Sequence, residues 1–164
     1  MKSIHIIGRK NSGKTTLVVE LIEYFTSQGI KVGSVKHTHH RHELDVPGKD
    51  SFRHREAGAN PVAILSPGMT AVFRHNPSGE AADGYAWIEP LFADCKLVLV
   101  EGNSATSQTK LEVWREVTGN LPMALEDSAV RAVISEDSPA VSQPVWPRNN
   151  VAELAERILK LAEV

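Results

Sequence analysis

The chain has 164 residues, of which 41% are hydrophobic and 23% are charged, and its net charge is −2. This composition is typical of one soluble globular domain, and we expect neither a membrane span nor a signal peptide. The basic residues form no stripe interleaved with aromatic residues, which argues against a nucleic-acid partner. Because Cys95 is the only cysteine, an internal disulfide is excluded and a cytoplasmic location is expected.

A phosphate-binding loop pattern, G-x-x-x-x-G-K-[ST], occupies residues 8–15. It follows the apolar residues 3–7, which predict a buried strand. It precedes residues 16–28, whose apolar side chains recur at the spacing of a helix face. A strand, a glycine-rich turn and a helix N-terminus together surround an anion with backbone N–H groups and the positive end of the helix dipole.

The pattern predicts which residues bind the nucleotide. Lys14 reaches the β- and γ-phosphates, and Thr15 offers its hydroxyl to Mg²⁺. The expected phosphate-binding residues are Gly8, Lys10, Asn11, Ser12, Gly13, Lys14, Thr15 and Thr16. Nucleotide binding therefore follows from this segment alone.

Strands and helices alternate along the rest of the chain. Strands are predicted for residues 30–35, 61–65, 70–74, 96–100 and 130–134, the second and third as a hairpin. Helices are predicted for residues 50–57, 83–93 and 151–162, and loops for residues 36–49 and 135–148. Pro90 is expected to kink or shorten its helix, and Asn150 with Glu153 to cap the last one. This alternation predicts an α/β fold, a three-layer P-loop NTPase domain with a mainly parallel central sheet, spanning residues 1–164 as a single nucleotide-binding domain.

Glu101 follows residues 97–100, part of the most hydrophobic run in the chain, which predicts a central parallel strand. NTPases need an acidic residue on the magnesium side of the site, at the end of a buried strand. We therefore expect Glu101 to hold a metal-bound water, to polarise the attacking water, or both. The alternative is a strand-end carboxylate in solvent.

Residues 35–53 concentrate histidines and charged residues, and they allow two interpretations. The imidazoles of residues 37, 39, 40 and 42 suit a transition metal, but their spacing is too tight for a helical pair and no cysteine supports them. The interpretation that we favour is a loop facing phosphate and substrate. Its positive charges would come from Lys36, His37, Lys49 and Arg53. Asp45 and Asp50 are then candidates for magnesium or water coordination.

The choice of base depends on residues 132–137. The guanine signature Asn-Lys-x-Asp does not occur in the chain. However, this segment ends a predicted strand where many P-loop GTPases read the base. A carboxylate on Asp137 or Glu136 can accept hydrogen bonds from guanine N1–H and its 2-amino group, which adenine lacks. An acidic residue in a solvated turn is an equal alternative.

Several sequence blocks recur in the order seen in one known family. They are residues 8–17, 35–40, 45–51 with Arg53, 57–59, 97–102 and 110–115. On these residues the chain resembles the MobB family, the molybdopterin-guanine dinucleotide biosynthesis adaptor proteins. The phosphate loop is common to many NTPases, whereas the His-His and Pro-Gly-Lys-Asp-Ser blocks together are quite specific.

The resemblance implies a protein that binds GTP with Mg²⁺, hydrolyses it weakly and forms a homodimer. It would assist MobA, the nucleotidyltransferase that joins GMP to molybdopterin, and molybdopterin is a further candidate ligand. Slow hydrolysis fits the sequence, in which Arg9 and Arg53 are the only candidates for an arginine finger. One departure is that Asn103-Ser104 replaces the family's usual Phe-Lys, with Lys110 as a candidate substitute for the lost basic contact.

Two other functions fit the same residues. A small-molecule kinase would use Asp45 or Asp50 as the base that accepts the hydroxyl proton, although the chain has no arginine-rich lid segment. A nucleotide-dependent metallochaperone would use the histidines of residues 37–42. Both remain alternatives to the GTP-binding adaptor.

Overall fold

The computed structural model describes residues 1–81 and 84–163. By its internal contacts the chain divides into two compact units, Met1–His37 with Glu89–Val164, and Thr38–Ile88. The phosphate loop and the parallel sheet both belong to the first unit. That residues 1–164 work as one nucleotide-binding domain stays a prediction.

The first unit contains a six-stranded sheet in which every neighbouring pair is parallel. Its strands are β1 (Ser3–Ile7), β2 (Val32–Lys36), β5 (Leu97–Glu101), β6 (Lys110–Val113), β7 (Val130–Ser135) and β8 (Val145–Pro147). Their order across the sheet is β2-β5-β1-β6-β7-β8. The sheet confirms the predicted α/β class with a parallel centre, the architecture of a P-loop NTPase.

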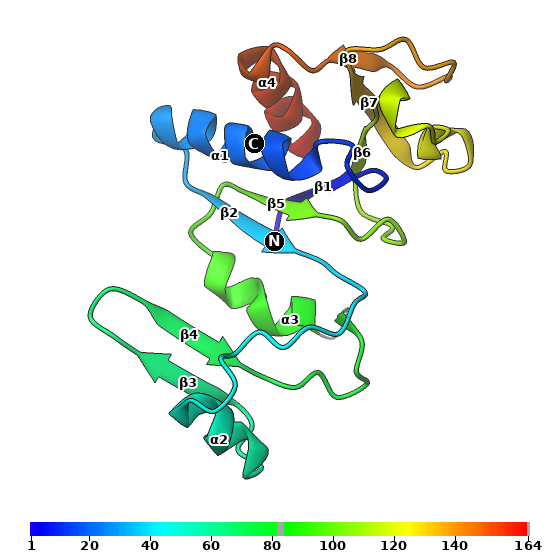
Figure 1. The fold of residues 1–164 in the computed structure, drawn as a ribbon. Helices are drawn as coiled ribbons and strands as arrows, with labels where there is room; N and C mark the ends of the chain where they lie inside the picture. The colour runs from blue at the N-terminus through cyan, green and yellow to red at the C-terminus, as the bar shows by residue number, and fades with distance from the viewer. Residues whose placement is uncertain (82–83, 164) are drawn as a thin grey trace. The chain divides into compact units, whose positions relative to one another are not determined.

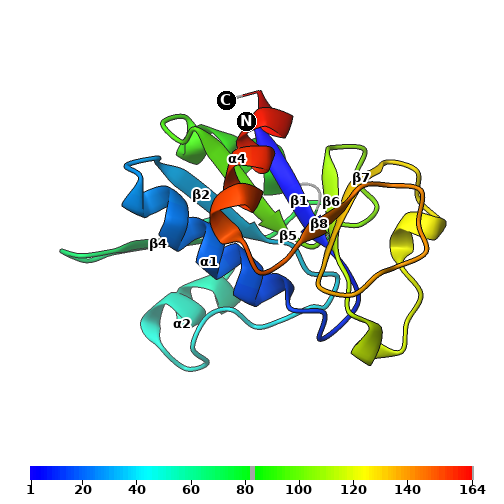
Figure 2. The same cartoon turned by 90° about the horizontal axis from the view of Figure 1, so that it is seen from above.

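Two helices cover the same face of this sheet. Helices α1 (Lys14–Ser27) and α4 (Val151–Ala162) contact each other and β1, as Figures 1 and 2 show from two directions. Ile4 and Ile6 of β1 point into this core, where they meet Leu17 and Leu21 of α1. Each of these side chains is at most 1% exposed, and burial of one such side chain contributes about 2 kcal/mol.

The opposite face of the sheet has a second apolar cluster. It consists of Ile7, Trp114, Ala124, Val130 and Val133, which come from β1, β7 and the segment after β6. Ala124 belongs to a short 3₁₀-helix, η4 (Met123–Leu125), that packs against β7. The side chains of β1 therefore alternate between two cores, as a parallel strand buried on both faces requires.

The C-terminal helix forms as predicted. The Asn150 side chain accepts a hydrogen bond from the Glu153 backbone N–H at 3.1 Å, which satisfies one of the free donors at the start of α4. Leu154, Ala155 and Ile158 are buried on its inner face. Both the cap and the apolar face confirm the prediction.

Three parts of the first unit differ from the prediction. Strand β6 and the 3₁₀-helices η3 (Glu116–Thr118) and η4 were not predicted. Residues 135–148 are not entirely loop, because β8 forms there and pairs with β7 at the edge of the sheet, where prolines are tolerated. The predicted helix 83–93 is instead α3 (Gly84–Ile88) followed by the 3₁₀-helix η2 (Glu89–Phe92), which contains Pro90. Asp83, its predicted first residue, lies outside the described residues.

The second unit contains a helix and a hairpin besides α3. Helix α2 (Asp50–Glu56) precedes β3 (Val62–Leu65) and β4 (Thr70–Phe73), which pair antiparallel as predicted. Arg55 bonds Glu43 and lies over the rings of Phe52 and Phe73, at 5.3 and 6.0 Å from their centroids. These contacts hold α2 to the hairpin. Among the described residues, no helix has the length and apolar character needed to cross a membrane.

Candidate functional site

The phosphate loop joins β1 to α1 through three residues with positive φ: Gly8 at 144°, Asn11 at 64° and Gly13 at 94°. A Cβ atom on Gly8 would lie 2.3 Å from the Val113 carbonyl oxygen, so the approach of the loop to β6 requires glycine. Gly13 is the N-cap of α1, and no side chain in the described part of the chain caps this helix. The first N–H groups of α1 are therefore available to an anion.

Ser12 adds a buried donor to this loop. Its residue is 2% exposed, and within residues 1–81 and 84–163 its Oγ has no hydrogen-bond partner. A buried hydroxyl without a partner costs about 1–3 kcal/mol. A phosphate oxygen is the kind of acceptor that would satisfy both this hydroxyl and the start of α1, so the loop fits a phosphate group.

Lys14 is directed at its own loop. Its Nζ donates a hydrogen bond to the Arg9 carbonyl oxygen at 2.7 Å. Burial lowers the pKa of Lys14, the nearby Lys36 lowers it further, and Glu101 raises it. Two ammonium groups and one carboxylate thus share a small region at the carboxyl ends of β2 and β5.

Glu101 connects three of the predicted residues. Its Oε1 accepts a hydrogen bond from Thr15 Oγ1 at 2.8 Å, and the same oxygen forms an ion pair with Lys36 Nζ. Lys36 and Glu101 are opposite one another in the register of β2 and β5. Glu101 is only 7% exposed, so it is not a carboxylate in solvent. A hydroxyl and a carboxylate oxygen are ligands that Mg²⁺ prefers, and these residues fit that ion.

Four predicted residues lie in the second unit and are described within it. Asp45 is 8% exposed, and its Oδ1 accepts hydrogen bonds from Ser51 Oγ at 3.0 Å and from the Val46 N–H at 2.8 Å. These bonds tie the preceding loop to the first turn of α2. Lys49, Asp50 and Arg53 are exposed, Lys49 as the N-cap of α2 and the others within it. Their nucleotide and metal roles stay predictions.

The histidines of residues 37–42 do not gather. In the described ranges, no three or more His, Cys, Asp or Glu side chains are placed to hold a metal ion together. The rings of His40 and His42 lie edge to face, with centroids 5.8 Å apart. His37 belongs to the first unit, where its backbone N–H bonds the Glu101 carbonyl oxygen at 2.9 Å.

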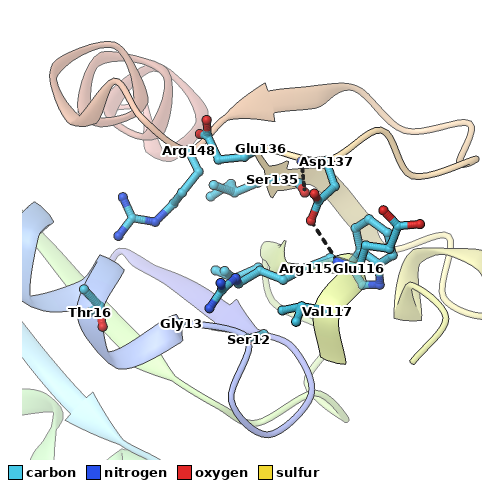
Figure 3. Close-up of a pocket in the computed structure, with 13 residues that line it drawn as sticks. Ser12, Gly13, Thr16, Arg115, Glu116, Val117, Ser135, Glu136, Asp137 and Arg148 are labelled. Carbon is cyan, nitrogen blue, oxygen red and sulfur yellow. Dashed lines mark hydrogen bonds between the residues drawn. The ribbon is translucent and has the colours of Figure 1, made fainter. Parts of the chain in front are cut away.

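A pocket of about 650 Å³ adjoins the phosphate loop, entirely within the first unit. Its walls come from the start of α1, the ends of β6 and β7, and the segment before α4 (Figure 3). Asp137 lines it, and its Oδ2 accepts the Glu116 N–H at 2.8 Å. The Asp137 N–H in turn donates to Ser135 Oγ at 2.9 Å. These bonds join the loops after β6 and β7.

Asp137 is therefore in the same pocket as Ser12, Gly13 and Thr16, which were predicted separately. Figure 3 shows the Asp137 carboxylate turned toward the Glu116 backbone and the Glu136 carboxylate turned away from the phosphate loop. The pocket also contains residues that were not predicted as site residues: Trp114, Arg115, Glu116, Val117 and Arg148. Arg115 ends the sequence block 110–115 and was within reach of the prediction, whereas no pattern marked Arg148.

The suggested substitute for a basic contact, Lys110, is wrong. Lys110 is 4% exposed, its Nζ donates to the Ser104 carbonyl oxygen at 3.1 Å, and it forms an ion pair with Asp127. This pair lowers the pKa of Asp127. The ammonium group is therefore engaged inside the protein and is not available to a ligand on the surface.

Comparison with known proteins places this fold and this loop in one family. The family model described as molybdopterin guanine dinucleotide synthesis protein B (MobB) matches residues 3–136. The chain is 32% identical to a molybdopterin-guanine dinucleotide biosynthesis adapter protein of Escherichia coli (strain K12), over 91% of this chain and 86% of the relative.

Two further relatives agree. A protein of the same description from Haemophilus influenzae is 32% identical, over 93% of this chain and 85% of the relative. A crystal structure of a molybdopterin-guanine biosynthesis protein B superimposes with a TM-score of 0.74 at 26% identity, covering 99% of both chains.

Proposed function

This chain belongs to the MobB family, and on that premise we propose that it is a GTP-binding adaptor with weak GTPase activity in molybdenum cofactor biosynthesis. The observation that carries the nucleotide assignment is the pocket beside the phosphate loop. One side of it contains Ser12, Gly13 and Thr16, and another contains Asp137 and Glu116. A guanine nucleotide has an anionic end for the first side and hydrogen-bond donors on its base for the second.

The base would be read by Asp137. One of its carboxylate oxygens is fixed by the Glu116 N–H, which orients the side chain. The carboxylate can then accept from guanine N1–H and the 2-amino group, whereas adenine offers an unprotonated N1 at this edge. Repulsion from adenine, as well as attraction to guanine, supports a preference for GTP.

Mg²⁺ is proposed beside the Thr15 hydroxyl and the Glu101 carboxylate, and when bound it would supply positive charge to the terminal phosphates. In this arrangement Lys14 holds the triphosphate and Glu101 orients water. The engagement of Glu101 Oε1 by both Thr15 and Lys36 supports slow hydrolysis, because that oxygen is not free to accept a proton. Arg9, a candidate arginine finger, lies 4.0 Å from Glu126.

We expect GTP to bind at least about tenfold more tightly than ATP, a difference of about 1.4 kcal/mol. The measurement is a side-by-side calorimetric titration of both nucleotides with Mg²⁺. Asp137→Asn should reduce the preference, because the amide nitrogen donates where guanine also donates. Glu136→Gln is the matched control and should leave the preference unchanged.

Equal affinities, or a preference for ATP, would remove the base assignment at Asp137. They would leave nucleotide binding at the phosphate loop in place and would move the small-molecule kinase to first position. Release of ADP or GDP that depends on an added hydroxyl substrate would then be the observation to seek.

The partner that we propose is a MobA-type nucleotidyltransferase, with molybdopterin as a second candidate ligand, a homodimer as the expected assembly and the cytoplasm as the location. We expect the transferase to bind the GTP-loaded protein at least about fivefold more tightly than the nucleotide-free protein, a typical coupling between two sites. Calorimetry with a non-hydrolysable GTP analogue measures this ratio. A ratio of one would show that the nucleotide does not control the partner.

A further inference from the structure

Two arginines from distant parts of the sequence meet at the nucleotide pocket. Arg115 follows β6, and Arg148 lies between β8 and α4. Figure 3 shows both guanidinium groups on the side of the pocket where α1 begins, near Gly13 and Thr16. The proposed contacts of the phosphate loop and of Asp137 use neither of them.

Arg148 is held in place by α1. Its Nη2 lies 2.6 Å from the Glu20 carboxylate, and Glu20 is one helical turn beyond Thr16. The side chain of Arg148 is 21% exposed. A guanidinium group carries five N–H donors in a fixed plane, so this ion pair orients Arg148 and leaves donors for a second acceptor.

Arg115 is held through its backbone. Its carbonyl oxygen accepts hydrogen bonds from the Thr118 N–H at 3.1 Å and from Thr118 Oγ1 at 2.8 Å. These bonds fix the turn at which Arg115 leaves β6, while its side chain is exposed to the pocket. Because a guanidinium pairs with a phosphate through two parallel hydrogen bonds, both arginines suit a phosphate ligand.

The lining of the pocket indicates which phosphate this is. Of the described loop residues, Ser12, Gly13 and Thr16 line the pocket, and Lys14 and Thr15 do not. Lys14 and Thr15 are the residues that serve the β- and γ-phosphates and the metal. The pocket therefore meets the nucleotide on its α-phosphate and ribose side. Asp137 and Glu116, toward the base, keep the two ends of the pocket opposite in charge.

We propose that Arg115 and Arg148 form a clamp on the α-phosphate of the guanine nucleotide, so that the protein binds guanosine mono- and diphosphates as well as the triphosphate. This inference rests on the proposed nucleotide function and adds two binding residues to it. Ser12, with its buried and unpartnered hydroxyl in the same wall, completes the donor set. The clamp acts on every phosphorylated form, whereas Lys14 acts only where a β-phosphate is present.

The test compares guanosine, GMP and GDP on the full-length protein by calorimetry. In Arg115→Gln and in Arg148→Gln we expect the affinity for GMP to fall at least about tenfold, the loss of one charge-assisted hydrogen bond, with guanosine affinity unchanged. The double variant Glu20→Gln with Arg148→Gln removes both members of the ion pair and should show the same loss without an unpaired carboxylate. Arg131→Gln, an exposed arginine on β7, controls for the loss of one positive charge.

Two results would overturn the clamp. One is GMP affinity that does not change in either arginine variant, or that is undetectable in the parent protein. The other is an equal loss for guanosine and GMP, which would place the arginines against the base. If instead the parent prefers adenine nucleotides and the arginine variants still lose monophosphate affinity, the clamp stands and the guanine assignment fails.

Discussion

Replacing Lys14 with alanine is expected to weaken binding of a non-hydrolysable GTP analogue about 100-fold, or about 2.7 kcal/mol. Lys14 Nζ bonds the Arg9 carbonyl oxygen at 2.7 Å and lies near the Glu101 carboxylate, so its charge is already positioned at the phosphate loop. The alanine variant loses that charge without disturbing Gly8 or Gly13. Calorimetry on both proteins measures the loss.

Glu101→Gln provides the contrast to Lys14→Ala. Glutamine keeps an oxygen that can accept from Thr15 Oγ1, so we expect nucleotide affinity to stay within about threefold while GTP hydrolysis falls at least about tenfold. The two variants therefore separate binding from chemistry. Hydrolysis in Glu101→Gln equal to that of the parent would remove the catalytic role of Glu101. Unchanged affinity in Lys14→Ala would remove the phosphate role of Lys14.

The local parts of this site could be predicted because their signals are contiguous in the sequence. The phosphate loop is a single motif between β1 and α1, and its glycines are required by the approach of the loop to Val113. Glu101 ends a run of buried residues that has only one plausible position, the centre of a parallel sheet. In both cases neighbouring residues carry the information.

Strand β6 could not be predicted because its inward-facing charges depend on distant partners. Lys110 and Glu112 make the segment look like a solvated turn, yet both are buried. Asp127 neutralises Lys110, and backbone N–H groups of η4 satisfy Glu112. A pattern of alternating charge and apolar residues does not reveal partners that lie beyond the segment itself.

Arg148 illustrates the same limit at the pocket. It follows a proline-rich segment that resembled surface loop, and its position depends on the pairing of β8 with β7 and on Glu20 in α1. Asp137 was predicted from its place after a strand, and the fold brings it to the pocket that Arg148 also lines. Chain order gave the first residue, whereas only tertiary contacts give the second.

Glu112 is the buried charge on which the wall of the pocket depends. The residue is 0% exposed, and its two carboxylate oxygens accept the Met123 and Ala124 N–H groups at 2.8 and 2.9 Å. It thus anchors η4, whose Ala124 belongs to the second apolar cluster with Trp114. Burial raises the pKa of Glu112, against the opposing effects of these hydrogen bonds and of Arg9.

We expect Glu112→Ala to lower the free energy of unfolding by about 3 kcal/mol, because two buried N–H groups lose their acceptor. Urea unfolding monitored by tryptophan fluorescence measures the change. Glu156→Ala, an exposed glutamate on α4, is the matched control and should stay within about 0.5 kcal/mol of the parent. A loss below about 1 kcal/mol for Glu112→Ala would show that water or a shifted η4 replaces the carboxylate.

The raised pKa also fixes the direction of a pH effect. The folded protein binds the Glu112 proton more tightly than the unfolded chain does, so this group stabilises the fold fully below its ordinary pKa of 4.5. That contribution is lost as the pH rises through the raised pKa. Glu112→Gln cannot titrate, so the stability of the parent relative to this variant should decline with rising pH over that interval. A rising difference would mean that the two backbone hydrogen bonds outweigh burial and that the pKa of Glu112 is lowered instead.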